Sequence, residues 1–450
     1  MSAEVRIHDT LTGELRTLEP RDPGKVGIYA CGPTVYGRIH VGNARPFVVF
    51  SLFKRFLEHL DYDVTFVVNV TDVNDKIYEA APGASAARAA EATAWYLEDV
   101  ARFGLDEVDH FPKVTETMDV IIRFIAELVD AGAAYEVDGD VYFRVSRQAD
   151  YGRLSGQRPD QVEEQEPNAR KEDPRDFALW KANKEDEDTW WDSPWGRGRP
   201  GWHIECSAMA EQLLGPAFEI HGGGLDLVFP HHENELAQSA ALGHEFARIW
   251  MHNGMLRFTG EKMSKSVGNV ATIQEAFEEW GREALLVFFL TAHWRSPIDY
   301  SEVTVGAAKS QWERLSTVTV DQAVVTPRDP PWTEFEEALD DDFNTPRALA
   351  ILNEWHRQGR GDDLTRGLDV FGLPQPKHRH LVHLDLEVRV TGTVSAVVTP
   401  GEDIVRLARD RQVARSTRKF DEADRLREQL RQQGWDVEDT ADGFRLVKEQ

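Results

Sequence analysis

Cysteine is scarce in this chain, since only Cys31 and Cys206 occur among its 450 residues. So few cysteines exclude a disulfide scaffold and favour a reducing compartment such as the cytoplasm. Long hydrophobic runs are also missing, because no stretch approaches the roughly 20 apolar residues of a membrane-spanning helix. The N-terminal residues lack the basic and apolar regions of a signal peptide. We therefore predict a cytoplasmic protein with no membrane segment.

Positive charge is in short supply too. The chain has 51 Lys and Arg against 78 Asp and Glu, which gives a formal net charge of -27. This acidity argues against a protein that coats nucleic acids, although a local basic strip could still bind one. Residues 406–433 form such a strip, with nine basic and five acidic residues. The strip is either a solvated pair of helices or a surface that contacts phosphates.

The order of the predicted elements indicates a parallel sheet. An apolar run at 26–30 predicts a strand, apolar residues at helical spacing predict a helix over about 44–60, and a β-branched run predicts a strand over 63–70. Strand, helix and strand form a βαβ unit, whose functional site lies at the carboxyl ends of its strands. The pattern returns later, with a strand at 218–221, a glycine loop at 222–224, a helix over 231–242 and a strand at about 248–252.

The remaining segments extend this unit into a larger molecule. A chain of this length should form two to four domains. We expect an α/β fold in which a Rossmann-like parallel-sheet catalytic domain carries an insertion and is followed by a mainly helical C-terminal region. The predicted segments are helices over 84–130, an insertion over about 133–200 with a strand at 140–145, helices from 302 to about 357, Gly- and Pro-rich connections over 359–376 and a β-like island at 387–394.

The tetrapeptide His40-Val41-Gly42-Asn43 follows the first predicted strand and opens a helix. A helix N-terminus offers unpaired N–H groups and the positive end of a dipole, which suits phosphate binding. Gly42 would let a nucleotide approach the backbone, and His40 could donate a hydrogen bond to a phosphate that gains charge in a transition state. The alternative is a histidine cap beside a packing glycine.

A second candidate is the loop Lys262-Met263-Ser264-Lys265-Ser266. Two lysines and two hydroxyls on a short loop suit a triphosphate, because the lysines neutralise the charge of a leaving pyrophosphate and the serines donate to phosphate oxygens. The alternative is an ordinary exposed basic loop.

A third candidate is a metal site. Thiolate, imidazole and carboxylate groups are typical zinc ligands. His231 and Glu235 share one helix face, since they are four residues apart, and Cys31 follows the first predicted strand at the carboxyl edge of the sheet. One site could therefore gather Cys31, Cys206, His231 and Glu235. The alternative is that both cysteines are buried as small hydrophobic residues.

Together these motifs resemble the cysteinyl-tRNA synthetases, which are class I aminoacyl-tRNA synthetases. His40 to Asn43 stand at the first signature of that class, and Lys262 to Ser266 match the second. The phrases typical of the cysteine-specific members are 31–36, 71–72, 201–209 and 229–235, and those of the C-terminal parts are 340–346, 420–425 and 434–440.

The resemblance implies an enzyme that joins L-cysteine to tRNA(Cys) with ATP and acts as a monomer. It assigns one Zn²⁺ per chain and Mg²⁺ bound with ATP. The implied residues are Cys31, Cys206, His231 and Glu235 for zinc; Thr71, Trp202 and His221 for cysteine; His40, Gly42, Asn43, Gly222, Gly223, Gly224, Asp226 and Lys265 for ATP; and His40, Asn43, Lys262 and Lys265 for catalysis.

The same resemblance implies a domain order. The predicted boundaries are 1–125 and 201–250 for the two halves of the catalytic domain, 126–200 for a connective insertion, 251–305 for a signature-loop and stem-contact region, 306–400 for a helical domain and 401–450 for an anticodon-binding region. The chain departs from the family at Asn43, where the class has a histidine, and over 358–400, which does not match the usual helical bundle.

Two alternative functions use the same residues. A related ligase joins cysteine to an amino sugar in the synthesis of low-molecular-weight thiols, but it has no need of the basic region after residue 400. A zinc-stabilised RNA-binding module without catalysis would have no need of the loop from Lys262 to Ser266. Both features favour the synthetase.

Overall fold

The computed structural model describes residues 4–105, 107–157, 168–258, 271–321, 331–382, 402–416, 419–440 and 443–449. The chain forms two compact units. The first comprises Met1–Lys309, Glu336–Ala348 and Val370–Gly372, and the second comprises Ser310–Phe335, Leu349–Asp369 and Leu373–Gln450. Within the described residues, no helix combines the length and apolar character that crossing a membrane requires.

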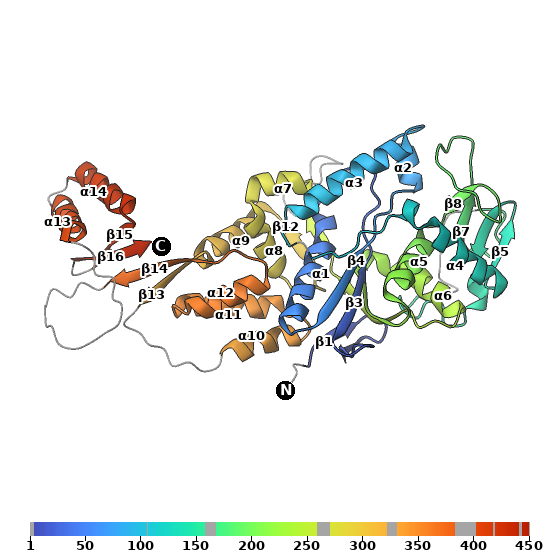
Figure 1. Ribbon diagram of the computed structural model, residues 1–450, viewed down its shortest axis with the longest axis horizontal. Coiled ribbons are helices and arrows are strands. Elements are labelled where there is room, and N and C mark those ends of the chain that lie inside the picture. The colour runs from blue at the N-terminus through green and yellow to red at the C-terminus, as the bar shows by residue number, and fades with distance from the viewer. Residues whose placement is uncertain are drawn as a thin grey trace. The chain divides into compact units, whose positions relative to one another are not determined.

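A four-stranded parallel sheet lies at the centre of the first unit (Figure 1). Its order is β10-β9-β3-β4, and Ile28 on β3 pairs with Phe66 on β4 and with Ile220 on β9. The predicted βαβ unit and parallel sheet are therefore confirmed. The strands and the helix that joins the first two are β3 (Lys25–Ala30), α1 (Val41–His59), β4 (Asp63–Val68), β9 (Phe218–Gly224) and β10 (Ala247–Asn253).

Helix α1 packs its aromatic face against this sheet. Phe50 and Phe53 are fully buried, and Phe50 occupies the space above Gly222, where an added Cβ would lie 2.0 Å from the Phe50 Cζ. The predicted glycine loop at 222–224 is wrong, because these residues are the buried end of β9. A glycine is required at 222 so that α1 can approach the strand closely.

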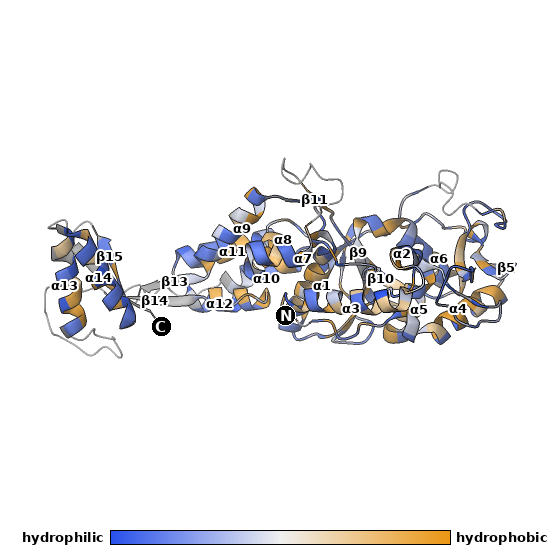
Figure 2. Ribbon diagram, turned by 90° about the horizontal axis from the view of Figure 1, so that it is seen from above, coloured by the Kyte–Doolittle hydropathy of each residue, from blue (hydrophilic) through white to orange (hydrophobic). Residues whose placement is uncertain are grey.

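The segment between β4 and β9 adds helices and a second sheet to the first unit. The predicted helical stretch 84–130 is divided into two helices by a loop, and the predicted insertion forms an antiparallel sheet of order β5-β6-β7-β8. Phe124, Trp180, Met209 and Trp250 belong to one hydrophobic cluster, so the insertion shares a core with the central sheet. In Figure 2, hydrophobic stretches, coloured orange, alternate with hydrophilic blue ones along helices such as α4 and α5. The elements are α2 (Asp75–Ala80), α3 (Ser85–Ala101), α4 (Met118–Asp130), β5 (Ala134–Val137), β6 (Asp140–Phe143), β7 (Phe177–Ala182), β8 (Gly198–Pro200), α5 (Trp202–Leu214) and α6 (Glu233–Ala241).

A buried arginine fixes the loop that follows β10. The Arg45 guanidinium donates hydrogen bonds to the carbonyls of Gly254, Met255 and Ser296, and its side chain is almost completely buried. These bonds tie α1 to two loops and satisfy backbone acceptors that have lost water. The remaining elements of this part are β1 (Arg6–Asp9), β2 (Glu14–Thr17), β11 (Leu256–Phe258), α7 (Ile273–Trp280), α8 (Arg282–Leu290), β12 (Ile298–Tyr300) and α9 (Glu302–Leu315).

The rest of the chain is mainly helical but also contains a sheet of order β13-β14-β16-β15. Helix α12 lies within 359–376, so the prediction of Gly- and Pro-rich connections there is wrong. Leu364 and Leu368 are buried at helical spacing, and Gly367 has no room for a side chain because a Cβ would lie 2.4 Å from the Leu352 Cδ2. The β-like island at 387–394 lies outside the described residues. The elements are α10 (Pro331–Asp340), α11 (Thr345–Arg357), α12 (Gly361–Val370), β13 (Thr317–Asp321), β14 (Lys377–Val382), α13 (Glu402–Ser416), α14 (Phe420–Gln432), β15 (Trp435–Thr440) and β16 (Gly443–Glu449).

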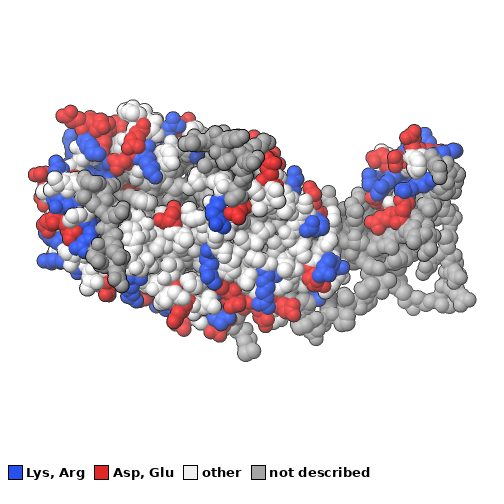
Figure 3. Space-filling view, turned by 180° about the vertical axis from the view of Figure 1, so that it is seen from behind, with Lys and Arg blue, Asp and Glu red and all other residues white. Residues whose placement is uncertain are grey.

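The basic strip at 406–433 falls on α13 and α14. Arg411 is almost fully buried and makes two hydrogen bonds to the carboxylate of Asp439, at 2.7 and 3.0 Å. Arg427 pairs with Asp436 at 2.9 Å. Figure 3 shows Lys and Arg side chains mixed with Asp and Glu on this part of the molecule. Part of the positive charge counted in the sequence is therefore used in ion pairs within the fold.

Candidate functional site

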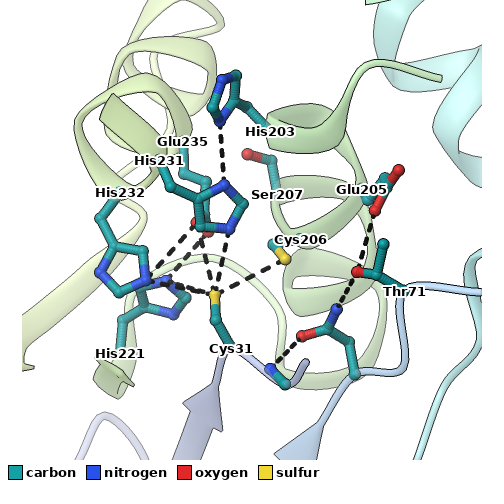
Figure 4. A network of polar contacts seen from close by, with 12 residues as sticks. Cys31, Thr71, His203, Glu205, Cys206, Ser207, His221, His231, His232 and Glu235 are labelled. Carbon is teal, nitrogen blue, oxygen red and sulfur yellow. Dashed lines mark hydrogen bonds and ion pairs between the residues drawn. The ribbon is translucent and has the colours of Figure 1, made fainter. Parts of the chain in front are cut away.

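A cluster of thiol, imidazole and carboxylate groups lies at the carboxyl edge of the central sheet (Figure 4). Cys31 directly follows β3, Cys206 lies on α5, and Glu235 lies on α6. His231 belongs to the irregular turn Val228–His232 that precedes α6. We call Cys31, Cys206, His231 and Glu235 the donor cluster. All four side chains are buried.

The donor atoms of this cluster all lie within 4.8 Å of one another. The Cys31 Sγ is 3.7 Å from the Cys206 Sγ, 3.4 Å from the His231 Nε2 and 3.6 Å from the Glu235 Oε1. The structure thus brings together the four residues that the sequence proposed as ligands. Two sulfurs, one imidazole and one carboxylate form a donor set that suits zinc.

A second set of four donors overlaps the first. It consists of Cys31, His221, His232 and Glu235. The His221 Nε2 lies 3.0 Å from the Glu235 Oε2, and the His232 Nε2 lies 3.3 Å from the Cys31 Sγ. His221 was predicted to line a cysteine pocket, whereas His232 was not singled out. The sequence feature that could have identified His232 as a candidate ligand is its position next to His231 and three residues before Glu235.

Further aromatic side chains hold the histidine rings in place. The His203 Nδ1 lies 3.0 Å from the His231 Nδ1, and Trp202 stacks on His231 with ring centroids 4.1 Å apart and planes at 17°. The His252 Nε2 lies 2.7 Å from the His232 Nδ1. Contacts of this kind orient ligands and select their tautomers. Sequence reasoning identified Trp202 but missed His203 and His252.

Interactions within the cluster favour the ionised forms of Glu235 and Cys206, whereas burial and the neighbouring Cys206 and Glu235 raise the pKa of Cys31. Burial acts to raise the pKa of Glu235, but the charges of His221 and His231 lower it to about 2. Burial acts to lower the pKa of His231, yet the charges of Glu235 and Cys206 raise it to about 10. Burial also opposes ionisation of Cys206, but the hydrogen bond from Cys31 and the charge of His231 lower its pKa to about 6. The Glu235 carboxylate and the Cys206 thiolate are therefore ready to bind a cation, and His231 would lose its proton to solvent when a cation binds.

Thr71, which was predicted to contact the substrate, is hydrogen-bonded to α5 one residue before Cys206. Thr71 is fully buried, and its hydroxyl donates to the Glu205 Oε2 at 3.3 Å and accepts from the Asn69 Nδ2 at 3.1 Å. The Asn69 Oδ1 accepts from the backbone of Gly32 at 2.8 Å. These bonds connect the chain after β4 with the chain after β3 and with α5. The roles of Asn69 and Glu205 were not predicted.

A cavity of about 400 Å³ extends from the donor cluster to the N-terminus of α1. Cys31 and Trp202 line it at one end, and His40, Gly42 and Asn43 line it at the other. We call the latter three residues the capped helix end. The cavity thus joins a site for a cation to a site for an anion.

The capped helix end is held by a reciprocal pair of hydrogen bonds. The backbone N–H of Gly42 donates to the His40 Nδ1 at 3.1 Å, and the backbone N–H of His40 donates to the Asn43 Oδ1 at 3.2 Å. Burial lowers the pKa of His40, although the charge of Asp226 opposes this effect. A neutral His40 that accepts at Nδ1 carries its proton on Nε2, from which it can donate to a ligand. Asn43 thus completes the capping box at the start of α1.

The other predicted nucleotide residues divide between the cavity and its surroundings. Gly224 and Asp226 line the cavity. Gly222 and Gly223 are buried in β9, and Gly222 faces Phe50. Lys262 and Lys265 lie outside the described residues.

Comparisons with known proteins identify the class. Residues 17–310 match the family described as tRNA synthetases class I (C) catalytic domain, and residues 334–359 match the DALR domain. A methionyl-tRNA synthetase of Mycobacterium tuberculosis in complex with methionyl-adenylate has a similar structure, with a TM-score of 0.55 and 15% identity over 77% of this chain and 88% of that chain. A leucyl-tRNA synthetase (LeuRS) of Agrobacterium radiobacter K84 has a TM-score of 0.53 and 11% identity over 79% and 83% of the two chains. The fold and the family match together define a class I aminoacyl-tRNA synthetase.

Full-length relatives identify the family within that class. The cysteine–tRNA ligase of Geobacillus thermodenitrificans is 43% identical over 471 residues, covering 98% of this chain and 99% of the relative. That of Halorhodospira halophila is 42% identical over 456 residues, covering 98% of each. The chain belongs to the cysteine–tRNA ligase family.

Proposed function

We propose that this protein joins L-cysteine to tRNA(Cys) through a cysteinyl-adenylate, with zinc in the donor cluster and Mg²⁺ accompanying ATP. The observation that carries the proposal is one cavity that is lined both by Cys31 of the donor cluster and by the capped helix end. Full-length relatives named cysteine–tRNA ligase support it.

The first step of the proposed reaction forms the adenylate. The carboxylate of cysteine attacks the α-phosphate of ATP, a P–O bond forms, and pyrophosphate leaves with the electrons of the broken P–O bond. No covalent bond to the protein is required, so the chain contributes alignment and charge stabilisation. His40 donates from Nε2 to the phosphate, and the N-terminal N–H groups of α1 face the same anion. Lys262 and Lys265 neutralise the pyrophosphate.

The second step transfers cysteine to tRNA. A hydroxyl of the terminal ribose attacks the carbonyl carbon of the adenylate, an ester bond forms, and AMP leaves. The proton of the hydroxyl passes to the departing phosphate or to solvent. Thr71 and Trp202 hold the amino acid in place during both steps, because each belongs to the hydrogen-bonded or stacked surroundings of the donor cluster.

Selection of cysteine requires more than shape. A pocket alone discriminates a near-isostere by only about 1–3 kcal/mol. Zinc bound by Cys31, Cys206, His231 and Glu235 would supply a ligand site for the substrate thiolate, which the hydroxyl of serine and the methyl of alanine do not match. The chain's own part is to present Cys206 and Glu235 already ionised. Neutral rings surround these donors, because burial lowers the pKa values of His203 and His232.

The test of the proposal is ATP–pyrophosphate exchange followed by tRNA charging. The purified protein should exchange pyrophosphate with cysteine and not with serine or alanine, and it should then form cysteinyl-tRNA(Cys). Cysteine transfer to an amino sugar, with no transfer to tRNA, would instead support the thiol-synthesis ligase. RNA binding without any exchange would support the non-catalytic module, and either result would refute our proposal.

A further inference from the structure

The cavity has a second wall, formed by residues to which the proposed binding of cysteine and ATP assigns no role. In the sheet order β10-β9-β3-β4, β9 and β10 lie on one side and β3 and β4 on the other. Residues at the carboxyl ends of these two strand pairs therefore line different sides of the cavity. On one side, Gly224 ends β9, Asp226 comes two residues later, and Gly254 directly follows β10. Tyr36, in the segment after β3, and Lys76, on α2 after β4, line the other side.

Tyr36 presents an aromatic surface at this wall. Its side chain is 49% exposed, which is unusual for a large aromatic residue in a cavity of this unit. The backbone beneath it is held in register, because the Val35 N–H donates to the Thr71 carbonyl at 3.1 Å and the Tyr36 N–H donates to the Thr34 carbonyl at 3.2 Å. The ring is therefore positioned by the same segment that carries the buried Thr71.

Lys76 adds a positive charge beside that ring. Its Nζ lies 5.9 Å from the centroid of Tyr36, and the side chain is exposed. Among the residues that the structure describes, Lys76 has no ion-pair partner. Arg38, which lines the same wall, is paired with Asp99 at 3.3 Å. In a chain with a net charge of -27, a cation without a partner at a cavity mouth attracts an anion.

We propose that Tyr36 and Lys76 receive the 3′-terminal nucleotide of tRNA, with the base stacked on Tyr36 and a backbone phosphate beside Lys76. This inference rests on the proposed function, in which a terminal ribose must reach the adenylate. Aromatic rings with adjacent cations are how proteins bind single-stranded nucleic acid ends. The wall lies on the opposite side of the cavity from Gly224 and Asp226, so the nucleotide would approach the adenylate without displacing it.

The test compares two activities of the full-length protein. Tyr36→Ala should raise the KM for tRNA in the charging reaction by about 10- to 100-fold, because base stacking is lost. Pyrophosphate exchange should change far less, so that the ratio of charging to exchange efficiency falls at least about tenfold. Tyr36→Phe keeps the ring and should restore charging.

The salt dependence tests the phosphate contact separately. Lys76→Ala should reduce the slope of log(kcat/KM) for tRNA against log salt concentration by about 0.7, the value for one contact to a single strand. Lys76→Arg should restore the slope. Lys113→Ala is the matched control, because Lys113 is paired with Glu116 at 2.6 Å and should change neither activity.

Three results distinguish failure of the proposed function from failure of the proposed role of Tyr36 and Lys76. No cysteine-dependent exchange by the wild-type protein would overturn the proposed function itself. Wild-type charging kinetics in both Tyr36→Ala and Lys76→Ala would overturn this inference and leave the proposed function intact. An increased KM for ATP in the exchange reaction, with tRNA kinetics unchanged, would assign this wall to ATP and overturn the inference as well.

Discussion

The two ends of the cavity are built in different ways. The donor cluster draws its side chains from segments far apart in the sequence, namely the end of β3, helix α5, and the turn and helix around Glu235. The capped helix end is local, since His40, Gly42 and Asn43 satisfy one another within four residues. The first end therefore depends on the packing of the whole unit, whereas the second depends on a short sequence motif. Substitutions should affect the two ends independently.

The largest expected effect is on the donor cluster. Cys206→Ser should lower zinc content and reduce cysteine-dependent exchange by more than about 100-fold, because even residues one contact removed from a metal cost about 10–100-fold. Zinc analysis of the purified protein and exchange kinetics measure the two effects. Ser207→Ala is the control, because its hydroxyl bonds to Gln238 and not to the cluster.

The same variant distinguishes the two overlapping donor sets. Full zinc content in Cys206→Ser, together with loss of zinc in His232→Ala, would assign the metal to Cys31, His221, His232 and Glu235. That outcome would contradict the ligand set proposed from the sequence.

The next effect in size is at the capped helix end. His40→Ala should reduce kcat for pyrophosphate exchange by about 100-fold, as expected for one donor that stabilises charge in a transition state. Zinc content should stay at the wild-type level, because His40 does not touch the donor cluster. Loss of zinc in this variant would show that the capped helix end and the donor cluster depend on each other, which would contradict their independence.

The smallest effect concerns the cap of α7, which pairs with the capped helix end. Thr272 forms an isolated bridge with His40 and exchanges hydrogen bonds with Glu275 at 2.8 and 3.2 Å. Thr272→Ala should reduce the free energy of unfolding by about 1 kcal/mol. Denaturant unfolding at neutral pH measures this difference, and Glu279→Ala, an exposed position on the same helix, is the control.

The pH dependence of the Thr272 effect has a defined sign. Hydrogen bonds from Thr272 hold the pKa of Glu275 below its ordinary value. A depressed carboxyl pKa contributes stability above the unfolded value of about 4.3 and loses it as the pH falls through the folded value. The difference between wild type and Thr272→Ala should therefore shrink in acid. An unchanged difference would show that the cap does not depend on the Glu275 carboxylate.

Patterns of apolar residues predict the helices and strands correctly where buried side chains recur at the regular spacing of a helix or a strand. The strands at 26–30 and 63–70 and the helix between them follow from β-branched runs and helical spacing, and they form β3, α1 and β4. Patterns failed at glycines, because the same residue suits loops and crowded contacts. The sequence predicts loops around Gly222 and Gly367, yet Phe50 fills the space beside Gly222 and Leu352 fills the space beside Gly367.

The candidate site was predictable to a similar degree. The scarcity of cysteine made Cys31 and Cys206 conspicuous, and the structure brings their sulfurs to 3.7 Å. His203, His232 and His252 could not be ranked from the sequence, because a histidine near a metal differs from any other only in what surrounds it. The loop from Lys262 to Ser266 and the domain boundaries stay predictions.

By itself, the sequence determined the chemistry available to this protein: two thiols, a histidine pair with a carboxylate one turn later, and a glycine-containing helix start. These are properties of residue type and short spacing. Tertiary structure alone decided which donors meet, which glycines serve packing, and which basic residues stay unpaired. The reason is that distances between remote segments, and the burial that sets their charge, arise only when the sheet and its helices pack together.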